Sequence, residues 1–273
     1  QLLQNLSGVD TGVLVGLMLI GSVHSAADDT ISLDERLRLL AQAYPDAISA
    51  VAGDELVFKS GARLMIDDAR RKSHAEKLAH ADIEDMLGQI YPIGKCHKGS
   101  RPARNFDPGR IRSAEFFRQV YGSHRRAVEQ NLVSLPWFRS KLRVTRVGGV
   151  DRALAAVAED LAKLPAKYRP IYETTAGTYA WRVIAGTKRL SAHSFGVAID
   201  LNTKFADYWR WAGGKPGNAP SYRNRIPQAV VEAFERHGFI WGGKWYHFDT
   251  MHFEYRPELI AIARLWESGR CET

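Results

Sequence analysis

The sequence predicts an α+β fold, with helices in the first half of the chain and strands in the second. Apolar residues recur at helical spacing over residues 28–48 and 113–133, whereas residues 142–147 (LRVTRV) alternate as a strand does. Because helices and strands are segregated along the chain, the pattern favours α+β over an alternating α/β fold. The chain has 273 residues, of which 45% are apolar and 25% charged, so it can bury a sizeable core.

The first half is expected to contain three helices and one hairpin. Tyr44-Pro45 ends the first helix, since proline disfavours a helical backbone in the residue before it. Ser60-Gly61 is the expected hairpin turn. In chain order, the expected elements are a helix within 28–48 that ends at Tyr44-Pro45, a hairpin over 54–66, a charged helix over 67–90, a loop over 91–110 rich in Gly, Pro, Lys and Arg, and a helix over 113–133.

The second half is expected to be richer in strands. Its expected elements are a strand over 142–147, a short helix over 153–164 closed by Pro165, strand-like stretches from Tyr168 onward, and a helix over 226–236 stopped by Gly238. A soft boundary near 140–150 divides a mainly helical N-terminal region (28–140) from a second region (141–273). A loop of the first region can still line a site in the second.

The N-terminal residues indicate a compartment. Residues 13–23 (VLVGLMLIGSV) precede the small residues 25–27, which is typical of the apolar region and cleavage site of a secretory signal. The run is shorter than the about 20 apolar residues of a transmembrane helix. No Lys or Arg precedes Val13, so a buried N-terminal helix is the alternative. We expect residues 1–27 to be a signal peptide or N-terminal anchor. The protein is then periplasmic or exported to the cell envelope, without a stable membrane span after processing.

The net charge limits the classes of binding partner, and the cysteine content excludes two kinds of cysteine site. Lys and Arg number 38 against 30 Asp and Glu, a net charge of +8 that favours an anionic polymer, either nucleic acid or an acidic cell envelope. No nucleic-acid-binding motif supports the first, so we expect no nucleic-acid partner. Cys96 and Cys271 are too far apart for a zinc knuckle or a redox C-x-x-C pair. One disulfide and two unpaired thiols both remain open.

Two short stretches contain the residues that point to chemistry, SAHSFGVAID (191–200) and DTMHFE (249–254). His193, Asp200 and His252 form a three-ligand set for zinc that leaves the fourth position open, as a catalytic zinc requires. Such a metal lowers the pKa of a bound water and polarises a carbonyl. Each of these residues alone would more often be an ordinary polar residue.

The spacing of these residues predicts their local geometry. Gly196 permits a positive φ or a close backbone approach after His193, and Asp200 lies on a predicted strand. His252 and Glu254 share one strand face, so Glu254 is either a base or a partner that holds the His252 imidazole. Asp249, three residues before His252, would point the opposite way on a regular strand. We therefore expect the chain to bend near Asp249-Thr250 and the strand to start at about Met251.

The combined motif resembles that of a known family. The pattern S-x-H-x-x-G-x-A-x-D (Ser191–Asp200), followed by D-x-x-H (Asp249–His252), is similar to the zinc D-Ala-D-Ala carboxypeptidases, which include VanY-like enzymes and the L-alanyl-D-glutamate endopeptidases of phage lysins. The resemblance covers at least residues 172–262, and DPGRIR (107–112) resembles a bacterial subgroup of the family. It implies an α+β fold with a small antiparallel sheet carrying a zinc site, shared with the hedgehog signalling domain.

The resemblance also implies roles for individual residues. It makes His193, Asp200 and His252 the zinc ligands, and 141–273 the catalytic domain. Asp249 matches the general base, which takes a proton from the attacking water and returns it to the leaving amine. The remaining implied or candidate residues are substrate-side. Arg182 matches an arginine that holds the substrate carbonyl or carboxylate and so stabilises the oxyanion, with a surface ion pair as the alternative, and Ser191 lines the cleft. His247 and Trp245 are candidate substrate-binding residues whose alternative is a place in the core.

The function that these residues predict is that of a zinc-dependent peptidase acting on peptidoglycan stem peptides, most simply a D-Ala-D-Ala carboxypeptidase. Asp249 stands where many members have Glu, which resembles the endopeptidases more, so L-alanyl-D-glutamate cleavage is the alternative. A non-catalytic, zinc-containing cell-wall binding module is a further alternative, although it predicts a lost base and Asp249 is present. The oligomeric state stays open.

Overall fold

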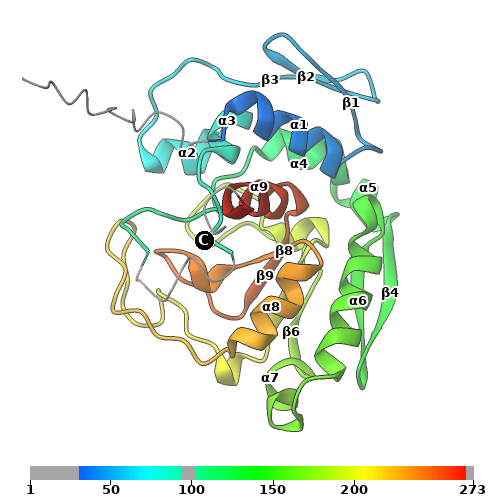
Figure 1. Cartoon of the computed structure of the whole chain (residues 1–273), viewed down its shortest axis with the longest axis vertical. Coiled ribbons are helices and arrows are strands. Elements are labelled where there is room, and N and C mark those ends of the chain that lie inside the picture. Colours follow the sequence, from blue (N-terminus) through cyan, green and yellow to red (C-terminus); the bar gives the residue numbers. More distant parts are fainter. Residues whose placement is uncertain (1–30, 94–101, 269–273) are drawn as a thin grey trace, which may run out of the picture. The chain divides into compact units, whose positions relative to one another are not determined.

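A four-stranded antiparallel sheet lies where the two sequence motifs meet. The structure is a computed structural model that describes residues 31–93 and 102–268. The strands of this sheet, in spatial order, are β6 (Thr175–Gly177), β7 (Ala198–Leu201), β9 (His252–Tyr255) and β8 (Phe239–Trp241) (Figure 1). All neighbouring strands run antiparallel. Together with the surrounding helices, this confirms the predicted α+β class.

Two smaller antiparallel sheets and a set of helices complete the described part of the chain. One sheet is β1 (Ile48–Ala52), β2 (Glu55–Phe58) and β3 (Arg63–Met65), and the other is β4 (Leu132–Trp137) and β5 (Ser140–Thr145). The α-helices are α1 (Leu33–Ala43), α2 (His74–His80), α3 (Ile83–Leu87), α4 (Ala114–Tyr121), α5 (Arg125–Glu129), α6 (Val150–Ala162), α7 (Arg169–Tyr172), α8 (Gln228–Arg236) and α9 (Pro257–Ser268).

Several predicted elements are found with small shifts. The first helix ends before Tyr44, and β2 and β3 form the expected hairpin, although β1 adds a strand that was not predicted. The strand predicted over 142–147 is β5, and the helices predicted over 153–164 and 226–236 are α6 and α8.

Two predicted helices are wrong because local capping and a glycine interrupt them. The helix expected over 67–90 is α2 and α3, since Ser73 and Asp82 each cap a new helix with their side chains. The helix expected over 113–133 ends at Gly122, whose φ is +130° and whose Cβ, if present, would lie 2.9 Å from the Val128 nitrogen. After the short helix α5, the chain turns into β4.

One hydrophobic core includes residues from both halves of the described chain. Helix α1 packs against α9, and α8 packs against α6 and β8 (Figure 1). Phe253 of β9 is fully buried and stacks on Phe234 of α8, with ring centroids 3.9 Å apart. Since side chains alternate along a strand, this packing directs His252 and Glu254 to the opposite face of the sheet.

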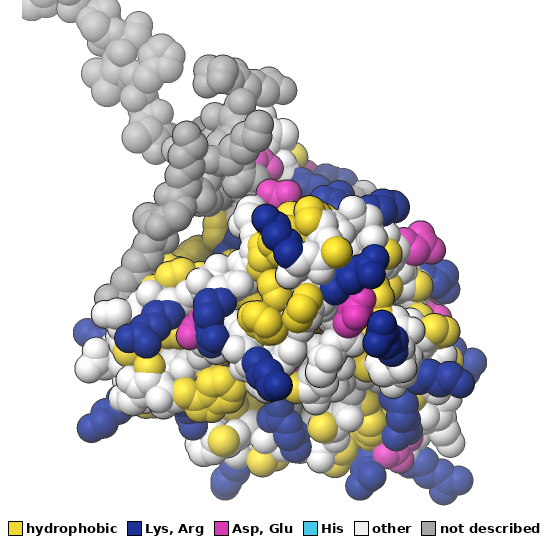
Figure 2. Space-filling view, turned by 90° about the horizontal axis from the view of Figure 1, so that it is seen from below, with side chains coloured by type: hydrophobic (Ala, Val, Ile, Leu, Met, Phe, Trp, Pro, Cys, Tyr) yellow, Lys and Arg dark blue, Asp and Glu magenta, His cyan; other side chains and the backbone are white. Residues whose placement is uncertain are grey.

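The predictions for residues 1–27, Cys96 and Cys271 lie outside the described residues. No helix within 31–93 and 102–268 has the length and apolar character needed to span a bilayer. Lys and Arg side chains are spread over the face seen in Figure 2, with fewer acidic ones between them, in keeping with the net charge of +8.

Candidate functional site

A short 3-10 turn over Ala192–Phe195 holds His193 in place. The Ser191 hydroxyl caps the turn by accepting a hydrogen bond from the His193 N–H (3.4 Å). Gly196 ends the turn with a φ of +68°, and a Cβ at this position would lie 2.7 Å from Leu132 Cδ2. Both features predicted for Gly196, a positive φ and a close approach, are therefore present, and they let the chain pass directly from the turn into β7.

The register of the sheet brings the two motifs together. In the antiparallel pairing of β7 with β9, Asp200 lies opposite His252 and Ala198 lies opposite Glu254. Directly opposed residues project from the same face of a sheet. The small side chain of Ala198 leaves space on this face, and the carboxylate of Asp200 meets the imidazole of His252.

Three side chains converge at this point, with separations that suit a tetrahedral ion. His193 Nε2 lies 3.1 Å from Asp200 Oδ2, His252 Nδ1 lies 3.0 Å from Asp200 Oδ1, and the two ring nitrogens are 3.3 Å apart. Zinc ligand bonds of about 2.0–2.1 Å place the ligand atoms of a tetrahedral site about 3.3 Å apart. The Asp200 side chain keeps 17% of its surface exposed, so solvent reaches the cluster.

The outer nitrogens of the two imidazoles show which way the lone pairs point. His193 Nδ1 lies 2.6 Å from the Thr178 carbonyl, which only accepts, so Nδ1 carries the hydrogen. His252 Nε2 lies 3.3 Å from Glu254 Oε2 and likewise donates. The inner nitrogens, His193 Nε2 and His252 Nδ1, then face each other beside the Asp200 carboxylate. A proton shared with Asp200 or a metal ion can occupy the space between these atoms, and three ligand atoms at these separations fit a metal ion.

The shifted pKa values of His252 and Asp200 are consistent with a cation site formed by these residues. Burial disfavours a charged imidazole, but the hydrogen bonds with Asp200 and Glu254 outweigh it and raise the pKa of His252 to about 10. Burial also opposes the ionised form of Asp200, yet the two histidines hold the pKa of this carboxyl well below its usual range. The cluster thus stabilises a positive charge at its centre.

Glu254 connects the cluster to a buried ionic network. Its carboxylate lies 2.7 Å from Arg112 Nη1 and 3.4 Å from Arg256 Nη1, as well as against His252. Burial would raise the pKa of Glu254, but the charge of Arg112 is the main factor that lowers it to about 2. Of the two roles considered for Glu254, the observed contact is the one that holds the His252 imidazole.

Asp249 lies in a bend just before β9, as the spacing predicted. Its N–H donates to the Gly242 carbonyl (2.9 Å), its own carbonyl accepts from the His252 N–H (3.2 Å), and the strand starts at His252, one residue later than expected. The Asp249 Oδ1 atom is buried without a hydrogen-bond partner in the described structure. Burial, reinforced by the charge of Asp200, raises the pKa of Asp249 to about 6.

The substrate-side residues predicted from sequence lie in different settings. Arg182 is exposed, and only its backbone is held, by an N–H donated to Ser194 Oγ (3.0 Å) and a carbonyl that accepts from the Ser191 N–H (3.0 Å). Ser191 is buried as the cap described above. Trp245 is buried, with its ring centroid 5.6 Å from that of His252, and its indole N–H donates to the Pro108 carbonyl (2.6 Å).

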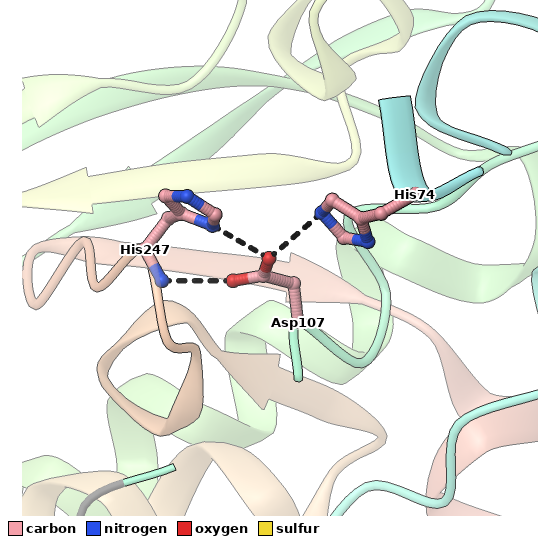
Figure 3. Close-up of side chains that lie close together, drawn as sticks. All are labelled: His74, Asp107 and His247. Carbon is pink, nitrogen blue, oxygen red and sulfur yellow. Dashed lines mark hydrogen bonds and ion pairs between the residues drawn. The ribbon is translucent and has the colours of Figure 1, made fainter. Parts of the chain in front are cut away.

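His247 belongs to a second cluster, with His74 and Asp107 (Figure 3). Asp107 accepts hydrogen bonds from the His247 N–H (2.8 Å) and from His247 Nδ1 (2.7 Å), and lies 3.3 Å from His74 Nε2. The three residues resemble a metal site, but His247 Nε2 accepts from the Gly217 N–H (2.9 Å). Neither nitrogen of His247 therefore has a free lone pair, and the cluster fastens the Asp107 segment to the sheet region instead.

This Asp107 segment was only partly anticipated. The DPGRIR stretch was noted as a resemblance, but its contacts to His247 and Trp245 join residues about 140 positions apart in the sequence. The predicted division near 140–150 stays a prediction, since the described residues from 31 onward form one compact unit in which this segment contacts the side chains of Trp245 and His247. The signal in the sequence was the combination of one acidic residue, a Pro-Gly turn and two arginines.

Comparison with known proteins supports the family suggested by the motifs. A family model described as D-alanyl-D-alanine carboxypeptidase matches residues 185–255, a segment that contains both motifs. No curated protein and no solved structure matches the chain. The match confirms the resemblance at the level of a peptidase family over about a quarter of the chain, and the described part of that segment holds a His and Asp group that could bind a metal ion.

Proposed function

We propose that this protein is a zinc-dependent peptidase that removes the terminal residue from D-Ala-D-Ala stem peptides of peptidoglycan. The observation that carries the proposal is the convergence of His193 Nε2, His252 Nδ1 and the Asp200 carboxylate within 3.0–3.3 Å of one another. His193 Nδ1 donates to the Thr178 carbonyl and His252 Nε2 donates to Glu254. The other ring nitrogen of each histidine is therefore the one that would bind a metal. We further propose a periplasmic or cell-envelope location, where this substrate is found.

A zinc ion held by these three residues would supply Lewis-acid activation of a water molecule and of the scissile carbonyl. The Asp249 carboxylate then acts as the general base and accepts a proton from the attacking water. Its Oδ1 atom is buried and unpartnered in the described structure, and its pKa of about 6 leaves it ionised at neutral pH but ready to hold a proton. Asp249 next passes that proton to the leaving amine.

The other candidate residues have supporting roles in the proposal. Arg182 is exposed beside the turn that carries His193, and we assign it to the developing oxyanion. Ser191 supports the cleft through the turn that it caps. Trp245 is assigned to the cleft wall through its packing against His252, and His247 through its packing against Trp209. Both act by shape, because their polar atoms are already hydrogen-bonded to protein groups.

A second candidate is L-alanyl-D-glutamate endopeptidase activity, which is favoured by Asp249 in the position where many carboxypeptidases have Glu. Aspartate is one methylene shorter, so the base must lie closer to the water that it activates. A non-catalytic binding module is disfavoured by the same residue, since a module without catalysis has no need of a buried carboxylate with a raised pKa.

The test is to incubate the zinc-loaded protein with purified muropeptides that carry pentapeptide stems, and to follow the products by mass spectrometry. Loss of one alanine from the stem indicates carboxypeptidase activity, and release of the sugar–alanine fragment from the rest of the stem indicates the endopeptidase. Asp249→Asn is the matched control, because it keeps the shape of the side chain and removes the base. Unchanged masses with protein of full zinc content would contradict both activities.

A further inference from the structure

The turn formed by residues 107–110 (DPGR) is held at every position by side chains from the second half of the chain. The contacts are Asp107 Oδ2 with His247 Nδ1 (2.7 Å), the Pro108 carbonyl with Trp245 Nε1 (2.6 Å), the Gly109 carbonyl with Arg256 Nη1 (3.0 Å), and the Arg110 carbonyl with Arg189 Nη2 (2.8 Å). The Arg110 N–H closes the turn by donating to the Asp107 carbonyl (2.9 Å). A surface loop without a task needs no such set of buried contacts.

Gly109 shows how closely the turn approaches the sheet. Its φ is +96°, and a Cβ at this position would overlap Ile240 Cδ1 of β8. Only glycine meets both conditions. The turn therefore delivers the next residue, Arg110, to one defined place.

The guanidinium of Arg110 lies near two indole rings, one of which packs against a proposed metal ligand. Its Cζ atom is 5.9 Å from the ring centroids of both Trp209 and Trp245. The ring of Trp245 in turn lies 5.6 Å from that of His252, so one indole separates Arg110 from a proposed ligand. Burial raises the pKa of Asp249, and the charge of Arg110 is the smallest of those that oppose this rise.

Arg110 has no hydrogen-bond partner for its guanidinium among the described residues. Its nearest carboxylate oxygen, Asp107 Oδ2, is 3.5 Å from Nη1 and already accepts from His247. The Nη1 atom is buried and, apart from this long ion pair, has no hydrogen-bond partner in the described structure. A planar group with several unused N–H donors is suited to bidentate recognition of a carboxylate.

The positive charges of Arg110, Arg112 and Arg189 together favour the binding of an anion near Arg110. Arg112 is paired with Glu254, but no carboxylate of the described residues lies within ion-pair distance of Arg189, which contacts the Arg110 carbonyl. Burial, followed by the charges of Arg112 and Arg110, lowers the pKa of Arg189 to about 9. The side of the cluster next to the DPGR turn thus has more positive than negative charge.

We propose that Arg110 binds the free terminal carboxylate of the stem peptide and so makes the enzyme a carboxypeptidase. This inference rests on the proposed function and deepens it. The terminal carboxylate lies one residue beyond the scissile carbonyl, so its anchor must lie near the metal ligands, and the turn holds Arg110 one indole ring away from His252. Arg182, whose carbonyl accepts from the Ser191 N–H, remains assigned to the oxyanion.

The experiment compares two substrates that differ only at the C-terminus. The zinc-loaded full chain is assayed with a stem peptide ending in D-Ala-D-Ala as the free acid and as the C-terminal amide. Wild-type protein is expected to cleave the acid with a KM lower by about 10–100-fold, the range of a lost charge-assisted contact. In Arg110→Gln the KM for the acid rises to that for the amide while kcat changes little, and Arg110→Lys is intermediate. Arg118→Gln, at an exposed ion pair with Glu115, is the matched control and leaves both values unchanged.

A direct binding measurement keeps the inference testable without turnover. Asp249→Asn loaded with zinc is titrated by calorimetry with the dipeptide D-Ala-D-Ala and with its amide. If Asp249→Asn binds the acid more tightly than the amide, and the double variant Asp249→Asn/Arg110→Gln binds both equally, Arg110 binds the terminal carboxylate. Equal binding or equal cleavage of acid and amide by protein that keeps Arg110 overturns this inference and leaves Arg110 a packing residue. Selective binding of the acid without any cleavage by the wild type would instead refute the proposed hydrolysis.

Discussion

Replacement of Glu254 by Gln tests the link between the buried ionic network and the metal-ligand cluster. Gln keeps the size of the side chain and can still contact His252 Nε2, but it removes the charge that faces Arg112 and Arg256. Arg112 is then left without a carboxylate, and Arg256 keeps only its pair with Glu258. Because all of these groups are buried or nearly so, solvent compensates little for the loss.

The size of the effect follows from the shifted pKa of Glu254. Burial acts against ionisation, but Arg112 and the other partners lower the pKa from 4.5 to about 2. At about 1.4 kcal/mol per pKa unit, this corresponds to about 3 kcal/mol of stability at neutral pH. Since the folded-state pKa is lowered, this contribution is present above pH 4.5 and is lost as the pH falls toward 2.

The assay is urea denaturation of Glu254→Gln and wild type at pH 7 and again at pH 3, together with a zinc titration. We expect a loss of about 3 kcal/mol at pH 7, a smaller difference at pH 3, and zinc affinity lower by about 10–100-fold, because a charged partner of a ligand histidine is removed. Glu115→Gln, at the exposed pair with Arg118, is the control and should change stability by less than about 0.5 kcal/mol. A loss below 1 kcal/mol with unchanged zinc affinity would refute the reasoning.

Three further predictions concern the turn, the base and the pH profile. Gly196→Ala should lower the free energy of unfolding by about 1–3 kcal/mol, because φ is +68° and Leu132 leaves no room for a Cβ atom. Gly148 has a similar φ of +64° but lies in open space, so Gly148→Ala is the control and should lose about 1 kcal/mol. Urea denaturation measures both losses. Asp249→Asn should lower kcat by about 10²–10⁴-fold with zinc content unchanged, as metal analysis and product formation would show. Activity of the wild type should rise with pH through about 6, because the Asp249 carboxylate must lose its proton before it can act as a base; a flat profile between pH 5 and 7 would speak against this role.

The candidate site was readable from the sequence where its residues are close in the chain. His193 and Asp200 are separated by a turn glycine and a short strand, and the bend at Asp249 followed from its three-residue spacing to His252. The pairing of Asp200 with His252 needed the register of β7 against β9, which no local pattern contains. The motif resemblance supplied that long-range step.

The errors in the fold have local causes that the sequence partly shows. The break between α2 and α3 follows from two capping boxes, Ser73 with Glu76 and Asp82 with Asp85. Their spacing is present in the sequence, but it lies within a continuous charged pattern that also predicts a single helix. The contacts of the DPGR turn were beyond such reading. They join Asp107 to His247 across 140 positions, and only the folded chain brings them together.

A continuous set of buried polar contacts connects the first helix to the cluster. The hydroxyl of Tyr44, at the end of α1, donates to Glu258 Oε2 (2.8 Å), and Glu258 Oε1 accepts from Arg256 Nε (2.5 Å). Arg256 then meets Glu254, which holds His252. Arg112 completes the set, so that two cations balance two anions in the interior. Neither region can supply this balance alone, because Tyr44 and Arg112 come from one and the two glutamates from the other. The orientation of the His252 imidazole therefore depends on packing of the helical region against α9, and not on the small sheet alone.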